Sequence, residues 1–384
     1  MRLLCDAIAF CYGPATALKQ ILEVWRPHVS AITLVATGTT KEYFERTSLV
    51  DELIEVDTEC PASMRRISSQ RWDALISICN PVGFLSLSKL ASVSIYWDFL
   101  FWMRFQGHAA EFAADFYAVE MYPGCAAAIK KWGREIPGIR EFPVLADWLS
   151  FTTAPEAGLI LVNLGGQRSK LTEPWVNTTY PALIIEQLQE ADVATGGSSR
   201  FLVTADMATS RRLAADYHKK GWRFVSLSHN EFQSELDRSD RVITHPGLYS
   251  PFESIGHGKP TFFLPSSNYT QVLQMRSFRD YGLAPQSIDW CDLLRTDVAF
   301  GLAEEEGVRQ VLTLIERASK DFVVRRRLRD EFSSWILMGE SELKVTASVQ
   351  RCASAPFFGN YKTSILSLLR EVEQRISARQ EVQE

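Results

Sequence analysis

The chain has 384 residues, 46% of them hydrophobic and 23% charged, which is the composition of a soluble globular protein with room for two domains of ordinary size. Its net charge of −5 comes from charges spread along the sequence. This argues against a general nucleic-acid binder, because such a protein needs a basic face. The densest basic cluster, residues 325–329, follows an apolar helical pattern, and we interpret it as a solvated helix face.

The sequence predicts neither a targeting segment nor a metal site. The first apolar run breaks at Asp6 and no small-residue cleavage site follows, so we expect no signal peptide. The most apolar window, residues 93–103, is interrupted by Asp98 and is shorter than the roughly 20 apolar residues of a membrane span, so we expect no stable membrane insertion. The seven cysteines include no C-x-x-C pair, which predicts neither a zinc site nor a disulfide framework, and reduced cysteines indicate a cytoplasmic protein.

The first half of the chain alternates short apolar strands with helical patterns. Pro14 suits the first turn of a helix, where its missing N–H costs nothing. Strands that alternate with helices predict parallel βαβ units in a doubly wound sheet. In chain order we predict a strand at 3–9, a helix at 14–25, a strand at 32–36, a helix at 39–46, and strands at 53–56, 74–78 and 93–97.

The polar, proline-bearing segment 151–157 precedes a new strand, and we place a domain boundary there. We expect an N-terminal domain at 1–152 and a second at 157–345, both α/β and Rossmann-like, with a ligand site in the cleft between them at the carboxyl ends of the strands. The C-terminal helix 361–380 is predicted to pack back on the first domain. In the second half we predict strands at 159–164, 201–204, 223–226, 241–244 and 261–264, helices at 180–191, 208–220, 230–238 and 250–257, and long helical stretches at 307–338 and 361–380.

The most informative stretch is 242–265. It has the pattern of an apolar strand, a glycine turn at Gly247, a helix with Glu253 in its second turn, another glycine turn and a second strand. A helix N-terminus behind a glycine turn binds anions, because its free N–H groups and the helix dipole point at the ligand. A carboxylate nearby is placed to accept hydrogen bonds from a sugar diol. The stretch therefore predicts a sugar-nucleotide site, with phosphates on the N–H groups and ribose on Glu253.

This order of residues resembles the donor-binding domain of GT-B glycosyltransferases. That group includes the antibiotic and plant UDP-sugar transferases and the transferase that adds N-acetylglucosamine to the peptidoglycan lipid precursor. The family pattern is a strand ending Thr-His-Gly-Gly, then Ser, Glu, Gly-x-Pro, a strand ending in Pro, and an Asp-Gln pair. This chain has Thr244-His245-Pro246-Gly247, Ser250, Glu253, Gly258-Lys259-Pro260, Pro265 and Thr270-Gln271, preceded by a strand that ends in Gly165-Gly166 and a segment 224–229 where the family holds the nucleobase.

The resemblance implies how a donor would be bound. The pyrophosphate would lie on His245 and Ser250 with the N–H groups around them, ribose on Glu253, and the donor sugar near Gln271. The nucleobase would meet backbone groups, and Gly166 to Ser169 would approach the phosphates or sugar. The implied donor-binding residues are, in chain order, Gly166, Ser169, Leu227, Ser228, His245, Gly247, Tyr249, Ser250, Glu253, Thr270 and Gln271.

The chain departs from this family at several positions. Pro246 replaces a glycine and removes one N–H, and Thr270 replaces the family Asp, which leaves room for an unusual donor sugar. Many relatives open their first helix with Gly-His-x-Thr-Arg, where the histidine is often the general base. Here the aligned residues are Gly13-Pro14-Ala15-Thr16-Ala17. The base must therefore lie elsewhere, or the acceptor must lose its proton easily, as a nitrogen heterocycle does.

Candidate replacements for the base lie at strand ends of the first domain. Asp98 follows Trp97 in an aromatic setting that would raise a carboxyl pKa, and Asp6 and Tyr12 flank the loop before Gly13. Each has a simpler reading as a strand end or a helix cap. The region after residue 97 lines the acceptor pocket in the family, which implies a flat aromatic or heterocyclic acceptor; one subgroup attaches a uronic acid to a cytosine nitrogen. The candidate acceptor-binding residues are Gly13, Trp97, Phe99 and His108, although an aromatic cluster is more often core, and His108 has the simpler reading of a satisfied polar residue.

The sequence thus predicts a metal-independent, inverting GT-B glycosyltransferase that moves a sugar from a UDP- or dTDP-sugar to a small-molecule acceptor, with no cofactor beyond this co-substrate. The charge on the departing nucleoside diphosphate would be held by helix N-termini. Two alternatives stay open. One is a nucleotide-sugar hydrolase or epimerase of the same fold, and the other is a non-catalytic binding or activator subunit. A homodimer is compatible with the sequence, which does not determine the oligomeric state.

Overall fold

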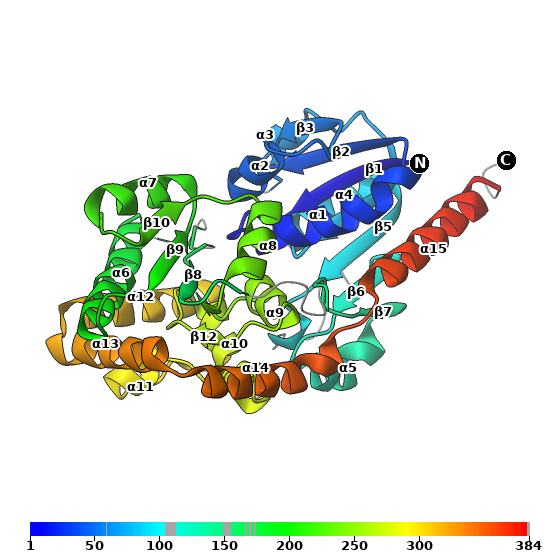
Figure 1. The fold of residues 1–384 in the computed structure, drawn as a ribbon. Helices are drawn as coiled ribbons and strands as arrows, with labels where there is room; N and C mark the ends of the chain where they lie inside the picture. The colour runs from blue at the N-terminus through cyan, green and yellow to red at the C-terminus, as the bar shows by residue number, and fades with distance from the viewer. Residues whose placement is uncertain are drawn as a thin grey trace. The chain divides into compact units, whose positions relative to one another are not determined.

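The computed structural model describes residues 1–58, 60–103, 113–148, 155–165, 167–168, 171–172 and 174–381. The chain forms two compact units (Figure 1). Unit 1 comprises Met1–Leu145 together with Phe357–Glu384, and unit 2 comprises Ala146–Pro356. Each unit is built on its own parallel sheet, which confirms the predicted α/β architecture of two Rossmann-like domains.

Unit 1 holds a seven-stranded sheet with the order β3-β2-β1-β4-β5-β6-β7. Neighbouring strands are parallel, and β1 lies between β2 and β4 with Cys5 opposite Leu34 and Ile76. β6 and β7 are absent from the sequence prediction. The strands are β1 (Arg2–Ala7), β2 (Ala31–Ala36), β3 (Glu52–Glu55), β4 (Trp72–Ile78), β5 (Ala91–Asp98), β6 (Phe116–Glu120) and β7 (Ile139–Phe142).

Helices cover this sheet, and one of them comes from the far end of the chain. The apolar stripe of α15 (Tyr361–Glu381) is buried, and the helix contacts α1 (Gly13–Trp25) and the strands β4, β5 and β7. The indole N–H of Trp25 donates to the carbonyl of Ile365 at 3.0 Å, which ties the two helices together. The other helices of unit 1 are α2 (Gly38–Phe44), α3 (Pro61–Met64), α4 (Pro81–Leu87) and α5 (Cys125–Trp132), with short 3-10 turns η1 (Arg26–His28), η2 (Ser88–Leu90), η3 (Phe101–Met103) and η5 (Gly133–Glu135).

Unit 2 holds a five-stranded parallel sheet with the order β10-β9-β8-β11-β12. One side of it is packed by a cluster of buried side chains that includes Leu161, Leu202 and Val242 from three strands and Phe232 and Leu236 from a helix. The strands are β8 (Leu159–Asn163), β9 (Arg200–Thr204), β10 (Trp222–Val225), β11 (Arg241–Thr244) and β12 (Thr261–Phe263), and the first helices are α6 (Val176–Ala194), α7 (Met207–Asp216), α8 (His229–Arg238), α9 (Tyr249–Gly256), α10 (Tyr269–Asp280) and α11 (Trp290–Leu294).

The helical stretch predicted at 307–338 contains a break that the sequence analysis did not predict. The stretch consists of α12 (Glu304–Lys320) and α13 (Phe322–Leu337), and α14 (Glu340–Ser354) follows it before a short turn, η6 (Ala355–Phe357). The break lies at Asp321, whose carboxylate accepts the N–H groups of Val323 and Val324 and so caps α13. Periodicity alone missed this break, because an Asp in mid-pattern reads as a solvated helical residue until its capping geometry is seen.

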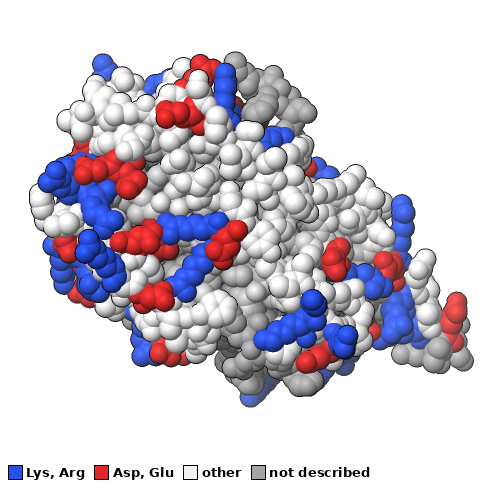
Figure 2. Space-filling model, turned by 90° about the horizontal axis from the view of Figure 1, so that it is seen from below, with Lys and Arg blue, Asp and Glu red and all other residues white. Residues whose placement is uncertain are grey.

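The basic cluster 325–329 lies on α13, where Arg325 and Arg329 form ion pairs with Glu186 and Glu190 of α6. Figure 2 shows basic and acidic side chains interspersed on the face that it draws. Among the described residues, no helix combines the length and the apolar character that crossing a bilayer demands.

Candidate functional site

The candidate donor site of unit 2 is built where β8 and β11 end side by side. Asn163 pairs with Thr244 in the sheet register, and its amide donates to the Thr244 hydroxyl at 3.3 Å. The carbonyl oxygen of the same side chain accepts the Gly165 N–H at 2.9 Å. One polar side chain therefore fixes the loop after β8 against the loop after β11, and the carboxyl edge of a parallel sheet is where such folds bind ligands.

His245 follows β11 directly and is 3% exposed. Its ring stacks on Tyr180, with centroids 5.3 Å apart, and its Nε2 lies 3.4 Å from the amide nitrogen of Gln167. That amide nitrogen can only donate, so Nε2 accepts and the hydrogen of a neutral ring lies on Nδ1. Burial lowers the pKa of His245 to about 4, which keeps the ring neutral at pH 7.

The Nδ1 atom of His245 is buried, and no hydrogen-bond partner for it lies among the described residues. A buried N–H donor without a partner costs on the order of 1–3 kcal/mol. An oxygen of a bound anion would satisfy it. The resemblance implies a phosphate contact at His245, and this buried, unpartnered nitrogen is compatible with one.

The turn that leads from His245 into α9 supports the same use. Pro246 lacks an N–H, and the Gly247 N–H donates to the His245 carbonyl at 2.8 Å, so neither supplies a free amide. At the start of α9, Leu248 and Ser250 carry N–H groups that have no earlier carbonyl of the helix to bind, whereas Pro251 has no N–H. A Cβ at Gly247 would meet nothing within 4 Å, and the residue does not have a positive φ. Neither packing nor backbone conformation therefore requires a glycine at this position. A ligand that lies directly against the backbone would require one, because a side chain would occupy its place.

Glu253 is buried in α9 and faces the segment that follows β10. Its Oε1 accepts from His229 Nε2 at 2.7 Å. The contact brings the expected ribose-binding carboxylate next to the expected nucleobase segment. The site prediction did not include His229. Its position directly after Ser228, inside the segment 224–229, is the signal that could have identified it.

Ser228 and Leu227 have structural partners in this segment. The Ser228 N–H and hydroxyl both donate to Glu231 Oε2 at 2.7 Å, which forms a capping box at the start of α8. Leu227 packs against the buried cluster beside β8. The Ser228 N–H is thus already used by Glu231, and a nucleobase at this segment would find its partners elsewhere along the backbone.

The start of α10 gathers a second group of polar side chains. Asn268 caps the helix by accepting the Gln271 N–H, and Gln271 Oε1 accepts the N–H and hydroxyl of Ser267 at 2.7 and 3.0 Å. The Thr270 hydroxyl donates to Glu304 Oε1 at 3.1 Å. Ser266 contributes a buried hydroxyl with no partner among the described residues. Hydroxyl, amide and carboxylate groups are the partners that sugar hydroxyls require.

Asp6 lies near the carboxyl end of β1 in unit 1 and is 2% exposed. Ser77 and Asn80 donate hydrogen bonds to its two oxygens at 2.9 and 3.1 Å. Burial raises the pKa of Asp6 to about 7, against the lowering effect of these two bonds. A Cβ at Gly83 of α4 would overlap Asp6, so this glycine lets the helix start close over the carboxyl group.

The predicted acceptor-binding role of the aromatic residues Trp97 and Phe99 does not agree with their burial in unit 1. Trp97 is fully buried, its indole donates to Glu120 at 3.2 Å, and it packs on Phe142, so it belongs to the core and offers no face to an acceptor. Phe99 is buried as well. Asp98 accepts hydrogen bonds from the Tyr117 hydroxyl at 2.6 Å and from the Leu100 N–H at 2.8 Å. The second bond is the capping role that the sequence analysis gives as the simpler interpretation of this residue.

The remaining candidates have varied placements. Tyr12 is the N-cap of α1, its carbonyl accepts the Thr16 N–H at 2.9 Å, and Gly13 is the first residue of that helix. Tyr249 is buried and Ser250 half-buried in the first turn of α9, where the Ser250 carbonyl accepts the Ser254 hydroxyl at 2.7 Å. His108, Gly166 and Ser169 lie outside the described residues.

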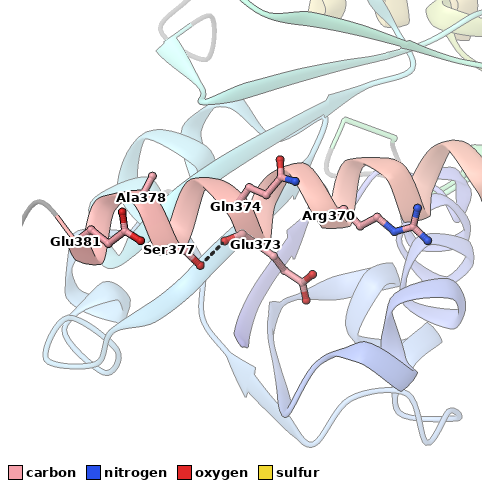
Figure 3. Close-up of a pocket in the computed structure, with 6 residues that line it drawn as sticks. All are labelled: Arg370, Glu373, Gln374, Ser377, Ala378 and Glu381. Carbon is pink, nitrogen blue, oxygen red and sulfur yellow. Dashed lines mark hydrogen bonds between the residues drawn. The ribbon is translucent and has the colours of Figure 1, made fainter.

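A shallow groove on α15 has no part in this chemistry. Its walls are side chains of this one helix, and the hydrogen bond drawn in Figure 3 joins Ser377 to the helix's own backbone. No predicted site residue lines it. Among the described residues, no group of three or more His, Cys, Asp or Glu side chains is arranged to hold a metal ion. The groove is lined by Arg370, Glu373, Gln374, Ser377, Ala378 and Glu381.

No protein-family model and no curated protein matches the sequence. Solved structures do match. The structure of Glycyrrhiza uralensis UGT73P12 complexed with glycyrrhetinic acid 3-O-monoglucuronide aligns with a TM-score of 0.56 at 8% identity, over 100% of this chain and 98% of that one. The chain has the GT-B glycosyltransferase fold. A ugt transferase from Siraitia grosvenorii in complex with UDP shares this GT-B fold with a TM-score of 0.51 at 10% identity over 97% and 99% of the two chains, and Acinetobacter baumannii MurG with 0.50 at 13% over 97% and 100%.

Proposed function

We propose that this protein is a glycosyltransferase that uses a nucleoside-diphosphate sugar, with UDP or dTDP as the nucleotide, and binds it at the carboxyl edge of the unit 2 sheet. The observation that carries the proposal is the unpartnered, buried Nδ1 of His245 beside the open face of Gly247 and the start of α9. Three independent features there favour an anion: a buried donor, open backbone and a helix N-terminus. The GT-B fold adds support, since the Siraitia grosvenorii transferase of this fold is in complex with UDP.

The proposed binding mode assigns a role to each end of the nucleotide. The pyrophosphate oxygens accept hydrogen bonds from Nδ1–H of His245 and from the N–H groups at the start of α9. The ribose hydroxyls bind Glu253, and they compete there with His229, which lies at 2.7 Å from that carboxylate. The charge that develops on the departing diphosphate is stabilised by these fixed dipoles, without a metal ion. This mode belongs to an inverting transfer, because we assign no carboxylate as a nucleophile.

We assign the role of proton acceptor for the attacking group to Asp6. The described residues give Asp6 neutral hydrogen-bond donors and no ion pair, so its ionised form is poorly compensated. Burial holds its pKa at about 7, which is the range in which a general base works best. Asp98 also accepts hydrogen bonds on both of its oxygens, from Tyr117 and Leu100, and it stays the second candidate. We keep a small-molecule acceptor, with a heterocyclic nitrogen among the candidates, as part of the proposal.

Calorimetric titration with UDP and dTDP tests the donor site. We expect one of them to bind, and Glu253→Ala to weaken its Kd by about 10- to 100-fold, the range expected for lost hydrogen bonds to a charged group. Glu305→Gln, which changes an exposed carboxylate on α12, is the matched control and should leave the Kd unchanged. Equal nucleotide affinity in wild type and Glu253→Ala would refute the ribose role, and failure of both nucleotides to bind would refute the donor site.

A second measurement separates transfer from the alternatives. The protein is incubated with a panel of UDP- and dTDP-sugars, with and without heterocyclic acceptors, and free sugar, free nucleotide and glycosylated product are quantified. Acceptor-dependent release of nucleotide supports the transferase. Rapid release of free sugar without an acceptor indicates a hydrolase, whereas tight nucleotide binding without turnover indicates a binding protein. Asp6→Asn should abolish turnover and leave the nucleotide Kd unchanged.

A further inference from the structure

Glu304 is a half-buried carboxylate at the start of α12 that the sequence pattern did not single out. It is the first residue of the helix, and its Oε1 accepts the Thr270 hydroxyl at 3.1 Å. Burial raises the pKa of Glu304, opposed by that hydrogen bond. Within the described residues no cation forms an ion pair with it. Glu305 and Glu306, in the same turn, are exposed, so the general preference for acidic residues at helix starts does not explain why this one turns inward.

The contact between α12 and α10 specifies where Glu304 lies. A Cβ at Gly307 would overlap the ring of Tyr269, so only glycine lets the first turn of α12 lie directly on the first turn of α10. The Tyr269 hydroxyl donates to the Ala299 carbonyl at 3.0 Å and accepts the Leu302 N–H at 3.1 Å, which fixes the segment that leads into α12. Two helix starts are thereby locked together with Glu304 beside Thr270.

This arrangement leaves hydrogen-bonding capacity unused. A carboxylate can accept about four hydrogen bonds, and Thr270 supplies one. Ser266, which precedes α10 by three residues, offers a buried hydroxyl without a partner among the described residues, and Gln271 holds its amide at the same helix start. Acceptors and donors of this kind match the hydroxyls of a neutral sugar. A uronic acid, in contrast, would place a second negative charge near Glu304, and two buried like charges repel strongly.

We propose that Glu304, held beside Thr270 at the start of α10, hydrogen-bonds hydroxyl groups of the donor sugar and selects a neutral hexose over a uronic acid. This inference rests on the proposed donor site of unit 2 and names the class of sugar that it takes. Glu304 is 34 residues from Thr270 in sequence, so the carboxylate comes to this subsite from a different helix.

The test compares Glu304→Gln with the control Glu305→Gln and the wild type. Calorimetry gives the Kd of UDP and dTDP alone, of UDP-glucose, UDP-galactose and UDP-N-acetylglucosamine, of dTDP-glucose, and of UDP-glucuronate. We expect Glu304→Gln to leave the free nucleotide unchanged, to weaken the best neutral sugar nucleotide at least tenfold, and to tighten UDP-glucuronate. Thr270→Val should weaken the neutral sugar without admitting the uronate, which gives a second readout if Glu304→Gln is unstable.

The outcomes separate the two proposals. If nucleotides bind but Glu304→Gln changes neither hexose nor uronate affinity, the sugar role of Glu304 is overturned and the donor site stands. If Glu304→Gln weakens the free nucleotide as much as the sugar nucleotide, Glu304 acts on the fold or the nucleotide, and the sugar role is again overturned. If neither nucleotide binds the wild type, the donor site fails and the inference fails with it.

Discussion

Replacing Asp6 with asparagine should stabilise unit 1 at neutral and alkaline pH. The Asp6 carboxyl is buried and has neutral partners, so burial raises its pKa from 3.8 to about 7. The folded chain therefore binds this proton more tightly than the unfolded chain does. The resulting stabilisation is fully present below pH about 4 and is lost as the pH rises through about 7. An asparagine amide resembles the protonated acid, with an oxygen to accept from Asn80 and an N–H to donate to the Ser77 hydroxyl, and it does not titrate.

The size of the effect follows from the shift. A change of about three pKa units corresponds to about 4 kcal/mol, at about 1.4 kcal/mol for each unit. The free energy of unfolding of Asp6→Asn minus that of the wild type should be near zero at pH 4 and should rise to about 4 kcal/mol by pH 8. Combined with the predicted loss of turnover, this variant would exchange activity for stability, as substitutions of strained functional groups often do.

Urea unfolding between pH 4 and 8.5, followed by tryptophan fluorescence and circular dichroism, measures this difference. Other titrating groups are common to both proteins and cancel in the difference curve. Asp216→Asn, which removes an exposed carboxylate of unit 2, controls for the deletion of one negative charge. Carbon NMR of labelled aspartate carboxyls gives the Asp6 pKa directly. A difference curve that stays flat with pH, or an Asp6→Asn protein that is less stable throughout, would refute the reasoning.

Three further substitutions test single features. His245→Phe should keep or slightly raise stability, because it removes a buried donor without a partner, while nucleotide affinity in calorimetry falls at least tenfold. The wild type should lose stability as the pH falls from 6.5 to about 4, because the unfolded chain protonates this histidine first, and His245→Phe should not show that loss. Gly307→Ala should cost about 1–3 kcal/mol in urea unfolding, because its methyl overlaps Tyr269, whereas Gly247→Ala, with open space around it, should cost less than 1 kcal/mol. Asp321→Ala should lower helix content and cost about 1 kcal/mol, since it deletes the cap of α13.

Local patterns in the sequence were sufficient to predict much of this fold. Strands such as 32–36 and 74–78 are short apolar runs between helical patterns, and that alternation is a property of neighbouring residues. The helix start at residues 13–14 and the turn at Gly247 depend on spacings of a few residues, which any sequence displays directly. At Asp321 the local signal was ambiguous, and the predicted helical stretch 307–338 did not mark the break between α12 and α13.

Burial determines which side chains of the aromatic cluster an acceptor could reach, and the sequence does not show burial directly. A strand in a sheet covered on both faces is apolar throughout, so alternation does not show which side chains stay accessible. Trp97 was a candidate acceptor residue by type, yet it lies in the core with its indole bonded to Glu120. Asp98, its neighbour, accepts hydrogen bonds from Tyr117 and Leu100, and the sequence pattern does not predict these partners.

The sequence by itself determined the α/β class, the turn into α9 and the order of residues that resembles a donor site, because each depends on residues close together in the chain. Only the tertiary structure decided which groups meet. Glu253 meets His229 across 24 residues, Thr270 meets Glu304 across 34, and Asp6 meets Asn80 across 74. Such contacts, and the burial that moves the pKa values of Asp6 and His245, arise when separate elements pack and exclude water, and no spacing in the sequence encodes them directly.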